Sequence, residues 1–252
     1  MLKKDAVSGK ERSGNSLIEE LFLAGAHYGY RRSRRHPSVS PYIYATKGSA
    51  DIIDLEKTLT LLASAEEFVK KLGSQGKVIL FVGTKPEAKE AVKAAALELG
   101  MPYVVNRWIG GTLSNFGEIK KKIGELEAYQ KESAESREKY TKKERSLLAK
   151  KMKKLEAYFG GLLGLRKIPD AVFTVDPRAE LVAATETKKA GVPVVALANS
   201  DSDISDLDYP ILGNDASMPA IKLFTESIVR AYLAGRAEPE KPEKQEEKVE
   251  KK

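Results

Sequence analysis

A strand–helix–strand pattern between residues 77 and 105 constrains the fold of this chain more than any other feature. Residues 78–82 form a continuous apolar run, which is typical of a strand buried on both faces. Pro86 then opens an amphipathic segment that closes at Gly100, and a second apolar stretch follows at 102–105. Two strands joined by a helix of this length are expected to pair in parallel.

The same pattern recurs later in the chain. Residues 170–199 again have the order strand, helix, strand, and a short strand at 209–212 precedes a last helix at about 217–233. Strands that alternate with helices in this way predict an α/β fold, a parallel sheet with helices on both faces. Upstream we expect a short helix at 16–26, a strand at 41–46 and a helix at 55–72 that is closed by Gly73.

The segment between the two units does not fit a sheet. Its apolar residues recur at helical spacing in two narrow stripes, separated by polar residues, and the second stripe follows the capping box of Thr141 and Glu144. We predict an inserted antiparallel two-helix coiled coil at about 112–160, although two ordinary surface helices remain an alternative. The stripes are Phe116, Ile119, Ile123 and Leu126, then Leu148, Met152, Leu155 and Phe159.

Positive charge is concentrated in two regions. The net charge is +7, and residues 1–48 hold 9 basic and 4 acidic side chains, whereas residues 117–158 hold 13 and 8. Such asymmetry favours a polyanionic partner, with ordinary solvated surface as the alternative. The densest cluster is Arg31, Arg32, Arg34, Arg35 and His36.

The ends of the chain are polar. Residues 1–14 and 236–252 are expected to be disordered, which leaves one domain at 15–235. The chain contains no cysteine, no apolar run long enough to span a membrane and no apolar signal-peptide core. These features fit a cytoplasmic protein.

An enzyme of doubly wound fold is one functional hypothesis. In such folds the crevice lies beyond the carboxyl ends of the strands, where Lys85, Asp176 and Asp215 stand as candidates for binding a phosphosugar or nucleotide. The sequence has neither GxxxxGK[ST] nor GxGxxG, and Asp176 before Pro177 is more typical of a turn and cap residue. No pattern predicts a catalytic residue, a cofactor or a metal ion.

An RNA-binding protein is the hypothesis that we favour. The segment 106–116 holds residue types that contact phosphate or 2′-hydroxyl groups, beside Trp108, which we expect in the core. Thr112 is also a plausible cap for the first inserted helix. The predicted RNA-binding residues are Arg31, Arg32, Arg34, Arg35, His36, Arg107, Thr112, Ser114, Asn115, Lys120 and Lys121.

Several stretches, taken in order, resemble the bacterial small-subunit ribosomal protein S-two family. They are LFLAGAHYG, PYIY, IIDLEKT, ILFVGTK, NRWIGGTLSNF, IPDAVFTVDP, AGVPVVALANSDSD and GNDASMPAIKLFT, and they cover about Leu17 to Leu233. Within the basic cluster, Arg35 stands where the family usually has Trp, and His36 where it usually has Asn.

The resemblance implies a flavodoxin-like parallel sheet with an inserted helical hairpin. It also implies a structural, non-catalytic role in the small ribosomal subunit, bound to ribosomal RNA between head and body on the solvent side. Family members help S-one, a large multi-domain protein of the small subunit, to attach. S-one and neighbouring small-subunit proteins are therefore the expected protein partners. A hairpin that serves as a protein-docking arm is a further alternative.

Overall fold

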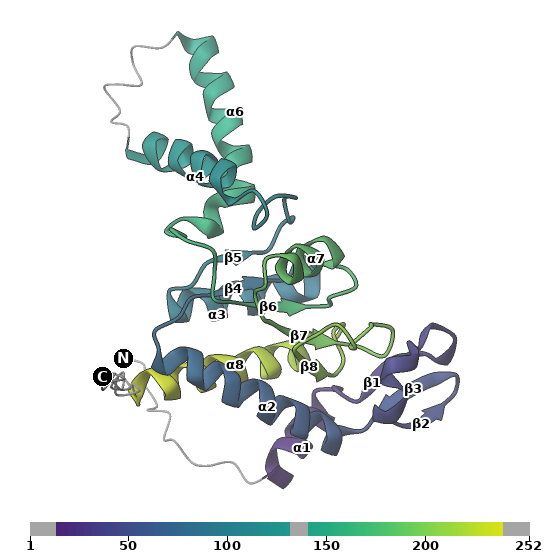
Figure 1. Ribbon diagram of the computed structural model, residues 1–252. Coiled ribbons are helices and arrows are strands. Elements are labelled where there is room, and N and C mark those ends of the chain that lie inside the picture. Colours follow the sequence, from purple (N-terminus) through teal and green to yellow (C-terminus); the bar gives the residue numbers. More distant parts are fainter. Residues whose placement is uncertain (1–13, 132–140, 239–252) are drawn as a thin grey trace, which may run out of the picture.

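In a computed structural model, which describes residues 14–131 and 141–238, five parallel strands form the centre of the molecule (Figure 1). Their spatial order is β5-β4-β6-β7-β8. The first strand of this sheet therefore lies between the second and the third, which is the order of flavodoxin-like folds. The strands are β4 (Ile79–Val82), β5 (Tyr103–Val104), β6 (Ala171–Val175), β7 (Val194–Ala198) and β8 (Tyr209–Leu212). The predicted parallel sheet is confirmed.

Helices cover both faces of this sheet, as predicted. Alternate residues of a strand point to opposite faces, so Phe81 and Phe173 pack on one side and Leu80 and Val172 on the other. The first side is covered by α2 (Leu55–Ser74), α3 (Pro86–Leu99) and α8 (Met218–Ala237). The second side is covered by α7 (Leu181–Lys189), Trp108 and the base of the inserted segment.

The prediction that Gly73 ends α2 is wrong. The helix continues through Gly73 to Ser74, and the glycine serves a close helix crossing instead. A Cβ atom at Gly73 would lie 2.2 Å from the carbonyl oxygen of Tyr232 in α8. Gly235 makes the reciprocal approach, since a Cβ there would lie 1.9 Å from the carbonyl oxygen of Lys70. The two glycines let the backbones of α2 and α8 touch.

A small antiparallel sheet precedes the parallel one, and the sequence pattern predicted only one of its strands. After α1 (Gly14–Leu23), the sheet has the order β1-β3-β2. The strands are β1 (Tyr28–Arg31), β2 (Ile43–Lys47) and β3 (Ala50–Ile53), and the short 3₁₀ helices η1 (Arg32–Arg34) and η2 (Pro37–Tyr42) lie between β1 and β2. Figure 1 shows this sheet beside the ends of β7 and β8.

The inserted segment forms two helices, α4 (Phe116–Lys131) and α6 (Lys142–Phe159), followed by η3 (Gly160–Leu162). Ile119, Ile123 and Leu126 are buried, as are Met152 and Phe159, in one cluster with the second face of the sheet. The capping box of Thr141 and Glu144 is confirmed. A coiled-coil pairing of the two helices is not confirmed, because residues 132–140 lie outside the described residues and the buried side chains gather at the base of the helices.

The predicted disordered ends lie almost wholly outside the described residues. Helix α1 begins at Gly14, and α8 continues to Ala237, one residue beyond the expected start of the tail. None of the helices in the described ranges is both long and apolar enough to cross a membrane.

Candidate nucleic-acid interface

The segment Arg31–His36, which we call the basic loop, is held against the turn after β7. The amide of Tyr30 donates to the hydroxyl of Ser200 over 2.8 Å, and the amide of His36 donates to the carbonyl of Ser200 over 2.9 Å. Gly29 allows this approach, since a Cβ there would lie 2.9 Å from the Ser200 hydroxyl. The basic loop therefore lies at the carboxyl ends of the parallel strands, where ligands bind in this class of fold.

Arg35 is bound inside the protein. Its guanidinium makes a bidentate contact with Asp51, with Nε at 2.6 Å from Oδ2, and also donates to Thr46 over 2.9 Å. The side chain of Asp51 is fully buried and that of Arg35 is 19% exposed. The hydrogen bond from Arg35 is the main reason that the pKa of Asp51 is lowered. Arg35 thus ties the basic loop to the antiparallel sheet.

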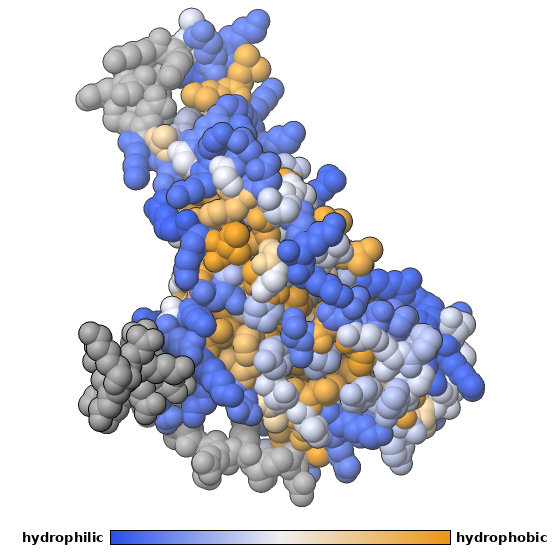
Figure 2. Space-filling view, in the orientation of Figure 1, coloured by the Kyte–Doolittle hydropathy of each residue, from blue (hydrophilic) through white to orange (hydrophobic). Residues whose placement is uncertain are grey.

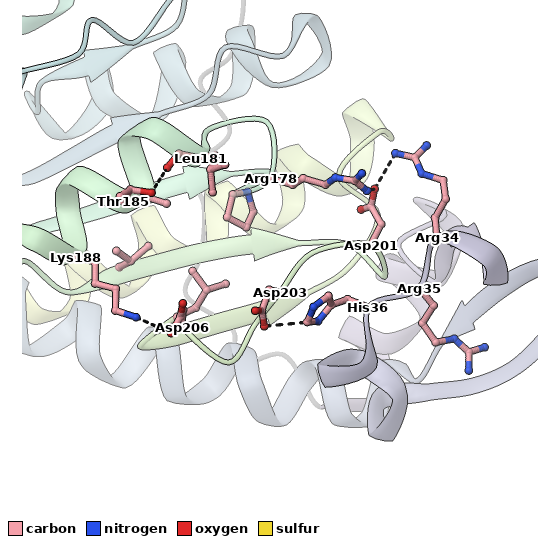
Figure 3. Close-up of a pocket in the computed structure, with 14 residues that line it drawn as sticks. Arg34, Arg35, His36, Arg178, Leu181, Thr185, Lys188, Asp201, Asp203 and Asp206 are labelled. Atoms are coloured by element: carbon pink, nitrogen blue, oxygen red, sulfur yellow. Dashed lines mark hydrogen bonds and ion pairs between the residues drawn. The ribbon is translucent and has the colours of Figure 1, made fainter.

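Arg34 and Arg178 share one carboxylate (Figure 3). Arg34 lies 2.9 Å and Arg178 lies 2.6 Å from the same oxygen, Oδ2 of Asp201. Asp201 is buried, whereas each arginine side chain is about half exposed. Since one carboxylate neutralises one guanidinium, the trio keeps a net positive charge at the surface. Arg34 also stacks on Tyr30, with its guanidinium carbon 4.5 Å from the ring centre.

These arginines line a surface pocket of about 480 Å³. Of its other side chains, Lys188 is bonded to Asp206, and Nδ1 of His36, which accepts from the amide of Ser38, lies 3.6 Å from Asp203 (Figure 3). Arg178 was missed by the sequence analysis. Its place directly after Asp176-Pro177, at the end of a predicted strand, was the available signal.

Arg31 and Arg32 differ from the other arginines. Both are exposed, and within the described ranges neither forms an ion pair. Only the backbone of Arg32 is held, through its amide to the carbonyl of Ser49 over 2.9 Å. They are the side chains of the basic loop whose charge is most available to a partner.

The second predicted group, Arg107 to Asn115, forms a turn at the base of the inserted helices. Glu186 of α7 holds the turn by accepting hydrogen bonds from the amides of Gly111 at 2.6 Å and Leu113 at 3.2 Å. Thr112 is buried, and its hydroxyl donates to the carbonyl of Ile109 over 2.6 Å rather than capping α4. By contrast, Arg107, Ser114 and Asn115 are exposed in this turn, and the predicted Lys120 and Lys121 are exposed on α4.

The inserted helices form the second region with an excess of basic over acidic side chains. Figure 2 shows hydrophilic residues over α4 and α6 and an apolar area where these helices meet the sheet. Lys121 is paired with Glu118, and Lys151 with Glu125. The basic side chains that form no ion pair with described residues are Lys120, Lys131, Lys142, Lys143, Arg145, Lys150, Lys153 and Lys154.

Helix α7 joins the two groups. The pocket beside Arg34 is lined by Leu181 and Thr185, whereas a smaller pocket of about 220 Å³ beside Arg107 is lined by Val182 and Ala183. Two different sides of the same helix therefore face the two predicted patches. A polyanion lying across α7 would meet Arg34 and Arg178 on one side and Arg107 on the other.

The residues of the enzyme hypothesis do come together, but they bind one another. The ammonium of Lys85 lies 2.5 Å from Asp176 Oδ2 and 2.8 Å from Asp215 Oδ2. Burial disfavours the charge of Lys85, but hydrogen bonds to the two carboxylates outweigh burial and raise its pKa. For Asp176, burial is likewise outweighed, chiefly by the bond from Lys85, and the pKa is lowered. Burial raises the pKa of Asp215.

Other carboxylate oxygens of Asp176 and Asp215 also accept hydrogen bonds within the protein. Asp176 accepts from the amides of Arg178 and Ala179 at 3.1 and 3.0 Å, which confirms its turn role, whereas the N-cap residue of α7 is Glu180. Asn199 donates to Asp215 over 2.8 Å. The cluster therefore closes the crevice with internal ion pairs, and Lys85 is not left free for a phosphate. In the described part of the chain, no three acidic or histidine side chains gather in a way that could hold a metal ion.

Comparisons with known proteins agree with the resemblance noted in the sequence. The family model described as "Ribosomal protein S2" matches residues 21–235. A curated relative, "Small ribosomal subunit protein uS2" of Geotalea uraniireducens (strain Rf4), is 40% identical over 222 residues, which cover 88% of this chain and 87% of the relative.

Proposed function

Because this chain belongs to the ribosomal protein S2 family, and is therefore a structural component of the small ribosomal subunit and not an enzyme, we propose that its basic loop, Arg178 and the exposed side chains between Arg107 and Lys121 bind small-subunit ribosomal RNA. The guanidiniums of Arg31 and Arg32, which are exposed and form no ion pair with residues 14–131 or 141–238, carry this proposal. They sit on a loop that is anchored at Ser200, so their charge is presented in a defined place. Because the backbone of the loop is already ordered, only the side chains of Arg31 and Arg32 have to be ordered when they bind phosphates.

Within this proposal the predicted residues have two roles. Arg31, Arg32, Arg107, Lys120 and Lys121 contact phosphates directly, and Ser114 and Asn115 add hydrogen bonds to sugar or phosphate. Arg34 acts with Arg178 as a pair. Arg35, His36 and Thr112 support the backbone that presents the others, because their polar groups are engaged within the protein.

Reversal of two charges tests the proposal. The double variant Arg31→Glu, Arg32→Glu should keep its fold and lose incorporation into small subunits by at least about tenfold, because it replaces roughly two phosphate contacts with repulsion. The matched control is Lys89→Glu, Lys93→Glu on α3, which makes the same charge change outside the proposed interface. Thermal melts report the fold, and co-sedimentation with purified subunits reports incorporation. Normal stoichiometry for the loop variant would overturn the proposal.

We further propose, from the family resemblance, that the protein lies between head and body on the solvent side of the subunit, in the cytoplasm, and supports attachment of protein S-one. An exposed apolar group supports a protein contact of this kind. Phe22, Leu23 and Tyr28 are 58%, 84% and 54% exposed, and Phe22 stacks on His27, which in turn lies against Tyr28. Subunits carrying Phe22→Ser, Tyr28→Ser should retain less S-one after a salt wash, and equal retention would contradict this role.

A further inference from the structure

A groove of about 540 Å³ runs between α3 and α8, on the face of the molecule that the proposed RNA contacts do not use. Its floor is apolar. Ala95 and Val229 are buried there, Ala91 is partly exposed, and Ala94 and Met218 are open to solvent. Met218 is 52% exposed at the start of α8 and adds apolar surface at the end of the groove.

The rim of this groove is acidic. Four carboxylates line it, Glu87, Glu90 and Glu98 on α3 and Glu226 on α8, against a single cation, Lys222. Lys222 lies 3.8 Å from Glu226 and so offsets one of the four. The protein as a whole has a net charge of +7, so the groove is opposite in sign to the net charge of the chain.

We propose that this groove binds a Lys- and Arg-rich amphipathic segment of a neighbouring small-subunit protein. RNA does not suit the site, because phosphates would meet the four carboxylates. Lysine and arginine suit both of its parts, since their aliphatic stems cover apolar surface while their charged ends reach the rim. A channel between two helices is also the shape into which an amphipathic segment docks.

The inference rests on the presence of the protein in the small subunit, which family membership shows, and not on the RNA contacts proposed above. The two can fail separately. Loss of the RNA contacts would abolish incorporation, whereas loss of the groove contact would leave the protein in the subunit and remove one neighbour from α3 and α8.

Crosslinking from the groove floor tests the proposal in assembled subunits. A photoreactive benzoylphenylalanine replaces the exposed Ala94 in the full-length protein, purified small subunits are irradiated, and crosslinked peptides are identified by mass spectrometry. We expect a crosslink to a peptide of another small-subunit protein in which Lys and Arg outnumber Asp and Glu. A crosslink to RNA, to a second copy or to residues 1–13 of the same chain, or no crosslink at all, would overturn the proposal.

Charge variants test the rim. Glu90 and Glu98 are exposed and pair with no described residue, so Glu90→Lys, Glu98→Lys should fold normally and lower the crosslink yield at least about tenfold. Glu56→Lys, Glu67→Lys on α2 is the control with the same charge change, and its yield should not fall. The milder Glu90→Gln, Glu98→Gln should give an intermediate yield and keeps the test valid if the lysine variant melts early. Equal yields in all three variants would refute a charge-selected partner.

Discussion

Arg31 and Arg35 lie four residues apart in one basic loop, yet their surroundings differ. Arg35 meets a buried carboxylate in two places, whereas Arg31 is open to solvent and unpaired among the described residues. A bidentate pair of this kind is costly to break, because removing one partner leaves the other with an uncompensated charge in a largely dry site. Charge reversal at Arg35 would therefore report on folding, while reversal at Arg31 reports on binding.

Asp51→Asn should destabilise the protein by about 3 kcal/mol, because Arg35 then loses its counterion. The loss should depend on pH. The pKa of Asp51 is lowered in the folded state, so its contribution is present above its unfolded pKa of about 3.9 and is lost as the pH falls through the lower folded value. The gap in urea midpoint between wild type and variant should thus be full at pH 7 and shrink below about pH 4. A gap that is constant down to pH 2 would contradict this account.

The sequence could predict the charge of these residues but not their partners. Asp51 lies 16 residues from Arg35, and Asp201 lies 167 residues from Arg34, so each pair exists only in the folded chain. The same holds for Lys85, because its two carboxylate partners, Asp176 and Asp215, lie in distant turns of the chain. For that reason the four arginines looked equivalent, and Lys85 looked like a free phosphate ligand.

Helices and strands were predictable where the apolar residues of a segment follow a single periodicity. The buried runs of the parallel strands and the long helices between them have clear patterns, and the structure confirms them. Strands β1 and β3 were missed because YGYR and ADII are short and β1 lacks an apolar alternation. Their stability comes from pairing with each other and from the turn at Ser200, which are contacts between distant residues.

The crossing of α2 and α8 gives a test at the level of elements. Gly73→Ala should destabilise the protein by at least about 1–3 kcal/mol, since the added methyl group would meet the backbone of α8 and the two helices would have to separate. Gly124→Ala in α4 is the control. A Cβ there meets nothing within 4 Å, so the change should stabilise by about 0.5–1 kcal/mol. Thermal melts compare the two, and a Gly73 variant as stable as wild type would show that the crossing can relax freely.

At the scale of the whole molecule, the cations of the basic loop and of the inserted helices that pair with no described residue predict a strong response to salt. If they neutralise roughly 6–10 phosphates, affinity for small-subunit RNA should fall by ~10³–10⁵-fold between 50 and 200 mM salt. Filter binding over that range measures the slope, and Lys153→Glu, Lys154→Glu should make it shallower if the inserted helices contribute. A flat salt response would mean that neither region contacts the phosphate backbone.

The start of β1 is tied to the far end of the chain. The amide of Asn214 donates to the carbonyl of Ala26, and the hydroxyl of Ser217 donates to the carbonyl of Ala24, directly before α8. During synthesis, α2 emerges early and α8 last among the described elements, an interval of roughly 10–30 s at ordinary elongation rates. Until then the apolar side of α2 lacks the cover that α8 provides. We therefore expect that a nascent chain arrested before α8 is not competent to join a subunit and is instead bound by chaperones or degraded.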